Sequence, residues 1–288
     1  MTAAICGLCP HHCRLQPGQT GLCRGRMNEG GKIVCKNYGA VTSLALDPIE
    51  KKPLARFHPG GFILSVGSYG CNLRCPFCQN HEIAQAGAER VERRHMEPEE
   101  LAGLALELAK EPRGNLGLAF TYNEPLISYE YILDTARLVK AEGLSVVLVT
   151  NGTICREPLE KLLPYVDALN IDLKGFNQAY YDWLGGDFET VRQTISLAAE
   201  SSHVEVTTLI VPGKNDSPEE MEAEAVWLAG LSPKLPLHIS RYFPRFRCEL
   251  PATPVTSIAG LVERARRHLR YVYAGNCVIP ETYLSRVP

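Results

Sequence analysis

Three cysteines stand within eight residues in the segment GCNLRCPFCQN, residues 70–80. Cys71, Cys75 and Cys78 follow a C-x3-C-x2-C spacing, with no obvious fourth thiol in the segment. A [4Fe–4S] cluster is normally held by four thiolates. Three thiolates would leave one iron free to bind a ligand that carries an amine and a carboxylate. The alternatives are a zinc site completed by His81, or three buried free thiols.

Strand-like and helix-like segments alternate with short connections after the first 55 residues. Apolar runs predict strands at residues 62–67, 116–121, 145–150, 167–172, 204–211, 236–240 and 271–275. Periodic segments between them predict helices at residues 97–111, 127–143, 156–165, 188–201, 217–230 and 255–270. This alternation requires a parallel sheet. We therefore expect an α/β fold, a partial (β/α)6 TIM-like barrel that occupies residues 56–288.

The ends of the six main predicted strands are polar or rich in glycine. The first strand leads to the three cysteines, and the others lead to TYNEP, TNG, DLKG, VPGKND and HISRYFPRF. In barrels of this type the functional residues lie at the carboxyl ends of the strands. We therefore expect these segments to meet in one site.

Residues 1–55 form a separate Cys-rich N-terminal segment with little apolar periodicity. Such a short segment usually needs a metal or another cross-link to fold. Zinc as a structural metal is the first interpretation, a second iron–sulfur cluster the next, and free thiols the third. The candidate ligands follow a C-x2-C-x3-C-x9-C spacing, with two histidines and a further cysteine nearby: Cys6, Cys9, Cys13 and Cys23, then His11, His12 and Cys35.

The composition is that of an ordinary globular protein of 288 residues, with 45% apolar and 22% charged residues. A net charge of -2 argues against a broad nucleic-acid-binding face. No apolar run approaches the roughly 20 residues of a membrane span, and the first residues lack the pattern of a secretory signal. We therefore expect a cytoplasmic protein without a membrane partner. In a reducing compartment, its 11 cysteines favour metal or cluster binding over disulfides.

Several motifs carry a resemblance to a known family. The segment GCNLRCPFC resembles the signature of the radical S-adenosylmethionine (SAM) superfamily, with Phe77 before the third cysteine. DPIEKKPLARFHPGG, CQNHEIAQ, TYNEP, NIDLKGF and LIVPGKND resemble the branch that contains pyruvate formate-lyase activating enzymes. The N-terminal CGLCPHHCRLQPGQTGLCRGRMNEGGKI is closer to the AmmeMemoRadiSam-system radical SAM enzymes. The resemblance extends to about residue 276.

The resemblance implies a radical enzyme. In such enzymes a reduced [4Fe–4S] cluster cleaves SAM to methionine and a 5′-deoxyadenosyl radical, which abstracts hydrogen from a substrate. The expected substrate is a protein or peptide, or a substrate that the sequence does not identify, and the expected electron donor is of the flavodoxin or ferredoxin type. A glycyl-radical enzyme activase is the alternative within this class. A non-catalytic iron–sulfur electron-transfer protein is the alternative outside it, and nucleic-acid modification is disfavoured by the charge.

The resemblance also implies contacts to SAM from the first strand ends. Phe77 shields the last cysteine, and Glu124 would pair with the amine of the methionine moiety. Tyr122 and Asn123 stand where the superfamily commonly has two glycines. The alternative for Glu124 is a carboxylate that stabilises the start of the following helix. Asn151 would bond the ribose or the carboxylate, unless Asn-Gly simply forms a turn.

Further contacts are implied at the later strands. Asp172 and Lys174 would bind the ribose hydroxyls and the methionine carboxylate of SAM. Thr207 occupies the position where relatives carry an arginine for that carboxylate. His238 resembles a histidine that contacts SAM in activating enzymes, and a hydrogen-bonded core histidine is the alternative.

Overall fold

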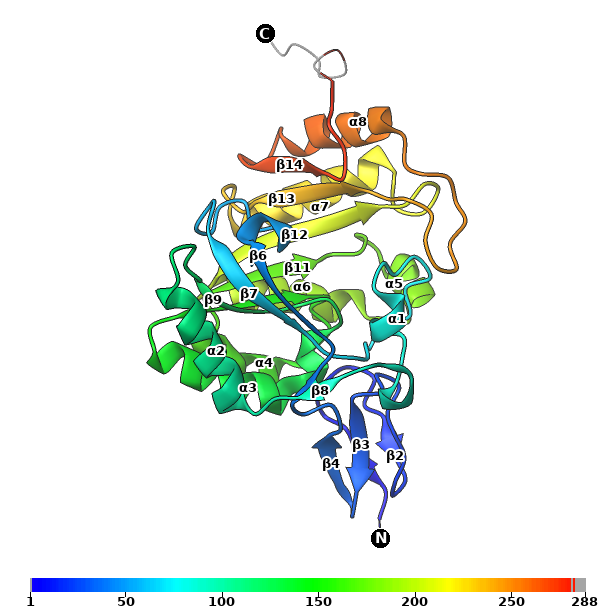
Figure 1. The fold of residues 1–288 in the computed structure, drawn as a ribbon. Helices are drawn as coiled ribbons and strands as arrows, with labels where there is room; N and C mark the ends of the chain where they lie inside the picture. The colour runs from blue at the N-terminus through cyan, green and yellow to red at the C-terminus, as the bar shows by residue number, and fades with distance from the viewer. Residues whose placement is uncertain (1, 281, 283–288) are drawn as a thin grey trace.

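The computed structural model describes residues 2–280 and residue 282, and an eight-stranded sheet runs through it (Figure 1). The strand order is β14-β13-β12-β11-β10-β9-β7-β6. Neighbours pair in parallel except β6 and β7, which are antiparallel. The strands are β6 (Ser43–Pro48), β7 (Phe62–Gly67), β9 (Gly117–Phe120), β10 (Ser145–Thr150), β11 (Ala168–Asp172), β12 (His203–Ile210), β13 (Leu237–Arg241) and β14 (Val272–Gly275).

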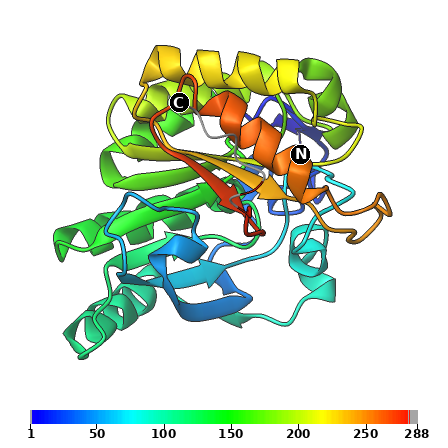
Figure 2. The same ribbon diagram turned by 90° about the horizontal axis from the view of Figure 1, so that it is seen from above.

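Helices connect the parallel strands and cover the outer face of the curved sheet (Figures 1 and 2). Neighbouring helices pack in pairs, α2 on α3, α4 on α6 and α7 on α8. The helices are α1 (His81–Ala84), α2 (Pro98–Lys110), α3 (Tyr129–Ala141), α4 (Arg156–Leu162), α5 (Gln178–Leu184), α6 (Phe188–Ala199), α7 (Pro218–Leu231) and α8 (Val255–Ala265). Short 3-10 helices are η1 (Ile49–Lys51), η2 (Ala88–Arg90), η3 (Pro125–Ser128) and η4 (Leu163–Tyr165).

Local sequence signals explain where several of these helices begin. The Ser217 side chain caps α7 by accepting a hydrogen bond from the Glu220 amide, and Pro218 occupies the first helical position. Asp187 caps α6 in the same way. These caps satisfy amide donors that have no partner within the helix. The connections that lead from the strand ends into the helices are therefore held in defined positions.

The predicted α/β architecture is confirmed. Strands β7 and β10 have the predicted bounds, and six parallel strands with intervening helices form the partial barrel, with β14 as a further parallel strand. The expected boundary near residue 55 does not coincide with the start of the sheet, because β6 already belongs to it. The Asp47-Pro48 end of β6 fits this position, because proline is tolerated in an edge strand.

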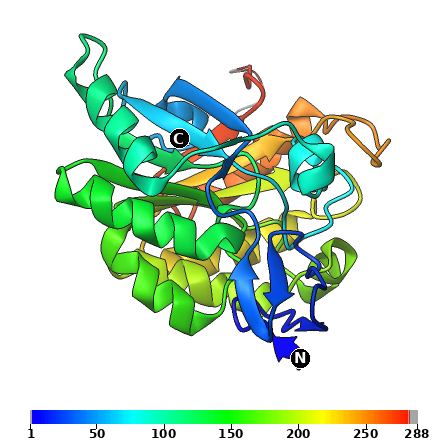
Figure 3. The same cartoon turned by 60° about the horizontal axis from the view of Figure 1, so that its bottom comes forward.

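The N-terminal strands form a separate group at one end of the molecule (Figures 1 and 3). They are β1 (Ala4–Ile5), β2 (Arg14–Leu15), β3 (Arg26–Glu29), β4 (Lys32–Cys35) and β5 (Ala40–Val41), the last paired with β8 (Arg94–His95). The buried Arg26 forms an ion pair with Glu130 of α3, which ties this group to the barrel. In the described part of the chain, no helix is long and apolar enough to cross a membrane.

Candidate active site

The loop between β7 and α1 carries the three closely spaced cysteines. Gly70 precedes them with φ +87°, a conformation that L side chains rarely adopt. A Cβ at this position would also collide with the carbonyl oxygen of Cys23. The loop therefore follows a path that requires glycine. Cys71, Cys75 and Cys78 line one cavity of about 460 Å³.

Residues from the next strand ends line the same cavity. The structure therefore brings together nearly all of the predicted site residues. They come from the segments after β7, β9 and β10, from the end of β11 and the segment after it, and from β12 itself: Phe77, Tyr122, Asn123, Glu124, Asn151, Asp172, Lys174 and Thr207. This convergence follows from the parallel sheet, because the carboxyl ends of parallel strands meet at one edge.

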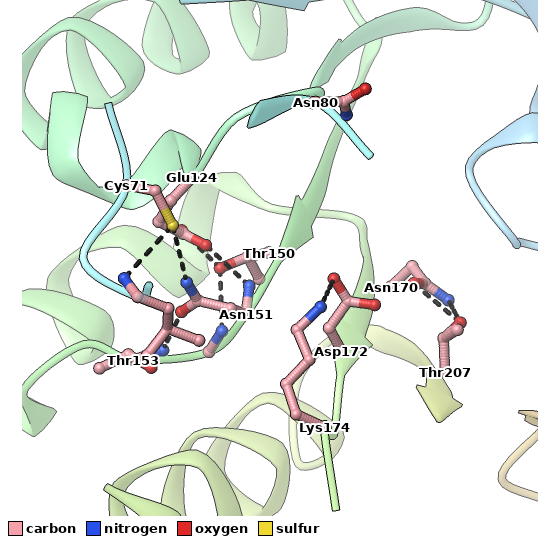
Figure 4. A network of polar contacts seen from close by, with 12 residues as sticks. Cys71, Asn80, Glu124, Thr150, Asn151, Thr153, Asn170, Asp172, Lys174 and Thr207 are labelled. Carbon is pink, nitrogen blue, oxygen red and sulfur yellow. Dashed lines mark hydrogen bonds and ion pairs between the residues drawn. The ribbon is translucent and has the colours of Figure 1, made fainter. Parts of the chain in front are cut away.

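Glu124 is buried at the wall of the cavity, and its carboxylate accepts three hydrogen bonds (Figure 4). The donors are the amide of Leu126 at 3.0 Å, the hydroxyl of Thr150 at 2.7 Å and the amide of Asn151 at 2.7 Å. Burial raises the pKa of Glu124 to about 7, although these donors oppose the rise. The predicted stabilisation of the helix start is confirmed, because Glu124 caps η3. A carboxylate has about four acceptor positions, so one remains for a ligand.

A network of amide side chains holds the first cysteine (Figure 4). The Asn151 side-chain nitrogen lies 3.6 Å from the Cys71 sulfur and 3.0 Å from the side-chain oxygen of Asn72. The amide of Thr153 donates to the other end of the Asn151 side chain at 2.9 Å. Asn151 is thus oriented from both ends, which is more than a simple Asn-Gly turn requires.

Asp172 and Lys174 form an ion pair of 2.8 Å at the end of β11 (Figure 4). Burial lowers the pKa of Lys174, but the Asp172 carboxylate, together with the negative charge that Cys75 carries as a thiolate, outweighs it and holds the pKa above its ordinary value. The ammonium group therefore stays charged beside the cysteines. A buried positive charge at this place suits a cavity that receives thiolates or a ligand carboxylate.

Burial disfavours the thiolate form of all three cysteines. Burial raises the pKa of Cys75 to about 12 although Lys174 opposes the rise, and burial also raises the pKa of Cys71 and Cys78. Thiols bind metals as thiolates, so loading of this site must release protons.

The residues present fit a three-thiolate cluster site. No other Cys or His among the described residues lines the cavity, and His81 instead stacks on Phe246 with ring centroids 4.4 Å apart. Within residues 2–280 and 282, no group of three or more His, Cys, Asp or Glu side chains could hold a single metal ion as placed. Thiolates that bind separate irons stand further apart than the ligands of one ion. The volume also lies in the range of small-molecule sites.

His238 lies outside this cavity, in an adjoining one of about 640 Å³. Its Nε2 lies 2.6 Å from a carboxylate oxygen of Glu205, and its ring stacks on Tyr273. This is the environment of a hydrogen-bonded core histidine. Thr207 lines the first cavity, but its hydroxyl is hydrogen bonded to Asn170. Neither residue replaces the positive charge that an arginine would supply.

A charged cluster lies where the two cavities adjoin, and it was not predicted from the sequence. Lys51 and Lys52 bind the Asp47 carboxylate at 3.0 and 2.9 Å, and the Tyr122 hydroxyl donates to it at 2.8 Å. Burial would raise the pKa of Asp47, but these donors hold it well below its usual range. Tyr122 itself has φ +72°, a strained conformation for this residue. The signal in the sequence was an aspartate followed by two lysines at the fourth and fifth positions.

Comparison with known proteins now identifies the family. The family described as "Radical SAM superfamily" matches residues 65–228, which is more than half of the chain. The chain belongs to the radical SAM superfamily. This radical SAM protein is 39% identical over 280 residues to "Uncharacterized protein MJ0808" of Methanocaldococcus jannaschii, covering 94% of this chain and 80% of that protein. It is 27% identical over 152 residues to pyruvate formate-lyase 1-activating enzyme of Escherichia coli K12, covering 51% of this chain and 60% of that enzyme.

Two solved structures share the fold. A radical SAM methyltransferase from Sphaerobacter thermophilus matches with a TM-score of 0.59 and 17% identity, over 76% of this chain and 67% of that chain. Streptococcus suis SuiB bound to S-adenosylmethionine matches with a TM-score of 0.56 and 14% identity, over 75% of this chain and 52% of that chain. The family membership implies a [4Fe–4S] cluster and SAM as cofactors.

Proposed function

We propose that this radical SAM protein cleaves SAM reductively at a [4Fe–4S] cluster and takes hydrogen from a protein or peptide. One observation supports the proposal most strongly. Three thiols and the charged groups of Glu124, Asp172 and Lys174 face one cavity of about 460 Å³. A non-catalytic iron–sulfur protein would need the thiols but would have no use for the charged groups around the remaining space.

The residues divide the work of binding between them. Cys71, Cys75 and Cys78 would hold the cluster, and Glu124 would accept a hydrogen bond from the ammonium group of SAM. Lys174, which stays charged, would receive the methionine carboxylate, and Asp172 the ribose hydroxyls. When bound, the reduced cluster supplies one electron that splits the S–C5′ bond of SAM into methionine and a 5′-deoxyadenosyl radical.

The substrate would approach through the adjoining cavity. Both cavities are lined by Lys52, Gln79, Tyr122 and Ser240, so the two spaces share a wall. The charged cluster around Asp47 would contact polar groups of the substrate at this opening.

Similarity to pyruvate formate-lyase 1-activating enzyme supports a protein as the substrate class and glycyl-radical activation as the second candidate. The similarity spans about half of this chain. An enzyme of this kind also needs a one-electron donor, for which a flavodoxin or ferredoxin is the proposed partner.

Anaerobic reconstitution tests the proposed reaction. The loaded protein is reduced with dithionite in the presence of SAM, and 5′-deoxyadenosine is measured by mass spectrometry. We expect product from the wild-type protein and from Cys277→Ala, a cysteine that does not line the cavity, and none from Cys75→Ala. A fully loaded wild-type protein that forms no 5′-deoxyadenosine would instead favour electron transfer as the function.

A further inference from the structure

Four cysteines that the proposed reaction does not use line a second, separate pocket. We call it the four-cysteine pocket, and its thiols belong to Cys6, Cys9, Cys13 and Cys23. Strand pairing between β1 and β2 brings Cys6 opposite Cys13, where the Cys6 amide donates to the Cys13 carbonyl at 3.0 Å. Cys6, Cys9 and Cys23 are buried. All four are free thiols.

The strands around this pocket are too short to be stable without further support. Strands β1 and β2 have two residues each, and β3 and β4 have four each. Strands of this size do not form an independently stable sheet. A small segment of this kind is usually held together by disulfides or a metal. Because the thiols are free and face one pocket, a metal centre is the cross-link that fits.

The four-cysteine pocket lies directly against the loop of Cys71. Gly70, on one side of Cys71, packs so closely on the Cys23 carbonyl that no Cβ fits between them. Asn72, on the other side, contacts two residues of the pocket. Its carbonyl lies 2.7 Å from His11 Nε2, and its side chain lies beside the Cys9 thiol. Both neighbours of Cys71 are therefore held by residues of this pocket.

We propose that Cys6, Cys9, Cys13 and Cys23 bind a second, thiolate-held metal centre that fixes the loop of Cys71 in the shape that receives the active-site cluster. The role in positioning rests on the proposed function, whereas the metal site itself does not. As placed, the described side chains could not hold a single metal ion, so zinc would require the thiols to move together.

Metal analysis of a variant without the active-site thiols tests the site. In Cys71→Ala/Cys75→Ala/Cys78→Ala, purified anaerobically and reconstituted with iron and sulfide, we expect retained metal. About four iron atoms per chain, together with sulfide, would identify a cluster, and about one zinc ion per chain would identify a single-ion site. Either result supports the metal site. Adding Cys9→Ser and Cys23→Ser should remove the metal, whereas adding Cys277→Ser should not. A triple variant that holds neither metal overturns the proposal. Failure of the proposed reaction in the wild-type protein would leave this result unchanged.

Hydrogen exchange tests the positioning role. In an otherwise wild-type chain, Cys9→Ser/Cys23→Ser should speed amide exchange in residues 68–74 and release of active-site iron to a chelator, each about tenfold. Circular dichroism and protection of β10 and β11 show whether the barrel remains folded. Unchanged exchange and iron release in a barrel-folded variant that has lost its second metal would refute the positioning role. If the variant does not fold, His11→Ala, which keeps all four cysteines and removes the contact to the Asn72 carbonyl, should produce the same faster exchange and iron release.

Discussion

Replacement of Glu124 by glutamine separates its structural role from its proposed role in binding SAM. The carboxylate accepts hydrogen bonds from Leu126, Thr150 and Asn151. In Glu124→Gln, the amide oxygen can keep two of these donors, and the amide nitrogen then faces the third. One unsatisfied buried donor costs roughly 1–3 kcal/mol.

The loss of charge offsets this cost. Burial raises the pKa of Glu124 from 4.5 to about 7. Above pH 7 the folded protein therefore holds the charged form at a cost of about 3 kcal/mol, since one pKa unit is about 1.4 kcal/mol. Glutamine carries no charge and avoids this cost. At pH 8 we therefore expect the free energy of unfolding of Glu124→Gln to lie within about 2 kcal/mol of wild type.

The affinity for SAM should change much more than the stability. A hydrogen bond to a charged group contributes about 1.5–3 kcal/mol, so the dissociation constant should rise roughly tenfold to a hundredfold. Isothermal titration calorimetry on the reconstituted protein measures it. Thr150→Val is the matched control, because it removes one donor to the carboxylate but keeps the charge, and it should weaken SAM binding only a few-fold. A wild-type dissociation constant in Glu124→Gln would refute direct pairing with SAM and leave Glu124 as a helix cap.

Further predictions concern other charged groups of the barrel. Hydrogen bonds from His203, His238 and two backbone amides outweigh burial and lower the pKa of Glu205 from 4.5 to about 2. This carboxylate should therefore contribute about 3 kcal/mol to the free energy of unfolding above pH 4.5, and this contribution is lost as the pH falls toward 2. Urea titrations of Glu205→Gln should lack that acid-dependent loss of stability. Lys174→Met should weaken SAM binding at least tenfold in calorimetry, and an unchanged affinity would exclude contact with the ligand carboxylate. Tyr122→Phe removes the hydroxyl that is hydrogen bonded to Asp47, and it should lower the free energy of unfolding by about 1 kcal/mol. Thermal denaturation measures this change, and an unchanged stability would show that the hydrogen bond adds nothing.

The barrel could be predicted from the sequence because its strands are buried on both faces. Such strands are continuous apolar runs, as in FILSVG and SVVLVT, and both have the predicted bounds. Strand β6 was not predicted as part of the barrel sheet, because it lies at the sheet edge, where one side is unpaired and Asp47 and Pro48 are tolerated. All of its residues except Asp47 are only partly buried.

The sequence predicts which residues gather at the site, because the ends of the strands determine this. Parallel strands bring Cys71, Glu124, Asn151 and Lys174 to one edge, whatever the details of the loops. Contacts between side chains on neighbouring strands depend on strand register, which the sequence pattern leaves open. Glu205 meets His238 only because β12 pairs with β13 in one register, and this contact places the histidine in the adjoining cavity.

The most direct test of the account is the electron paramagnetic resonance spectrum of the reduced protein with and without SAM. The protein keeps Cys6, Cys9, Cys13 and Cys23, and the spectrum of Cys71→Ala/Cys75→Ala/Cys78→Ala is subtracted to isolate the signal of the active site. We predict a [4Fe–4S]⁺ signal whose g values shift when SAM is added, because three thiolates leave one iron open to the ligand. The triple variant should show no signal that SAM shifts. A cluster spectrum that SAM leaves unchanged, or zinc in place of iron at Cys71, Cys75 and Cys78, would contradict the account.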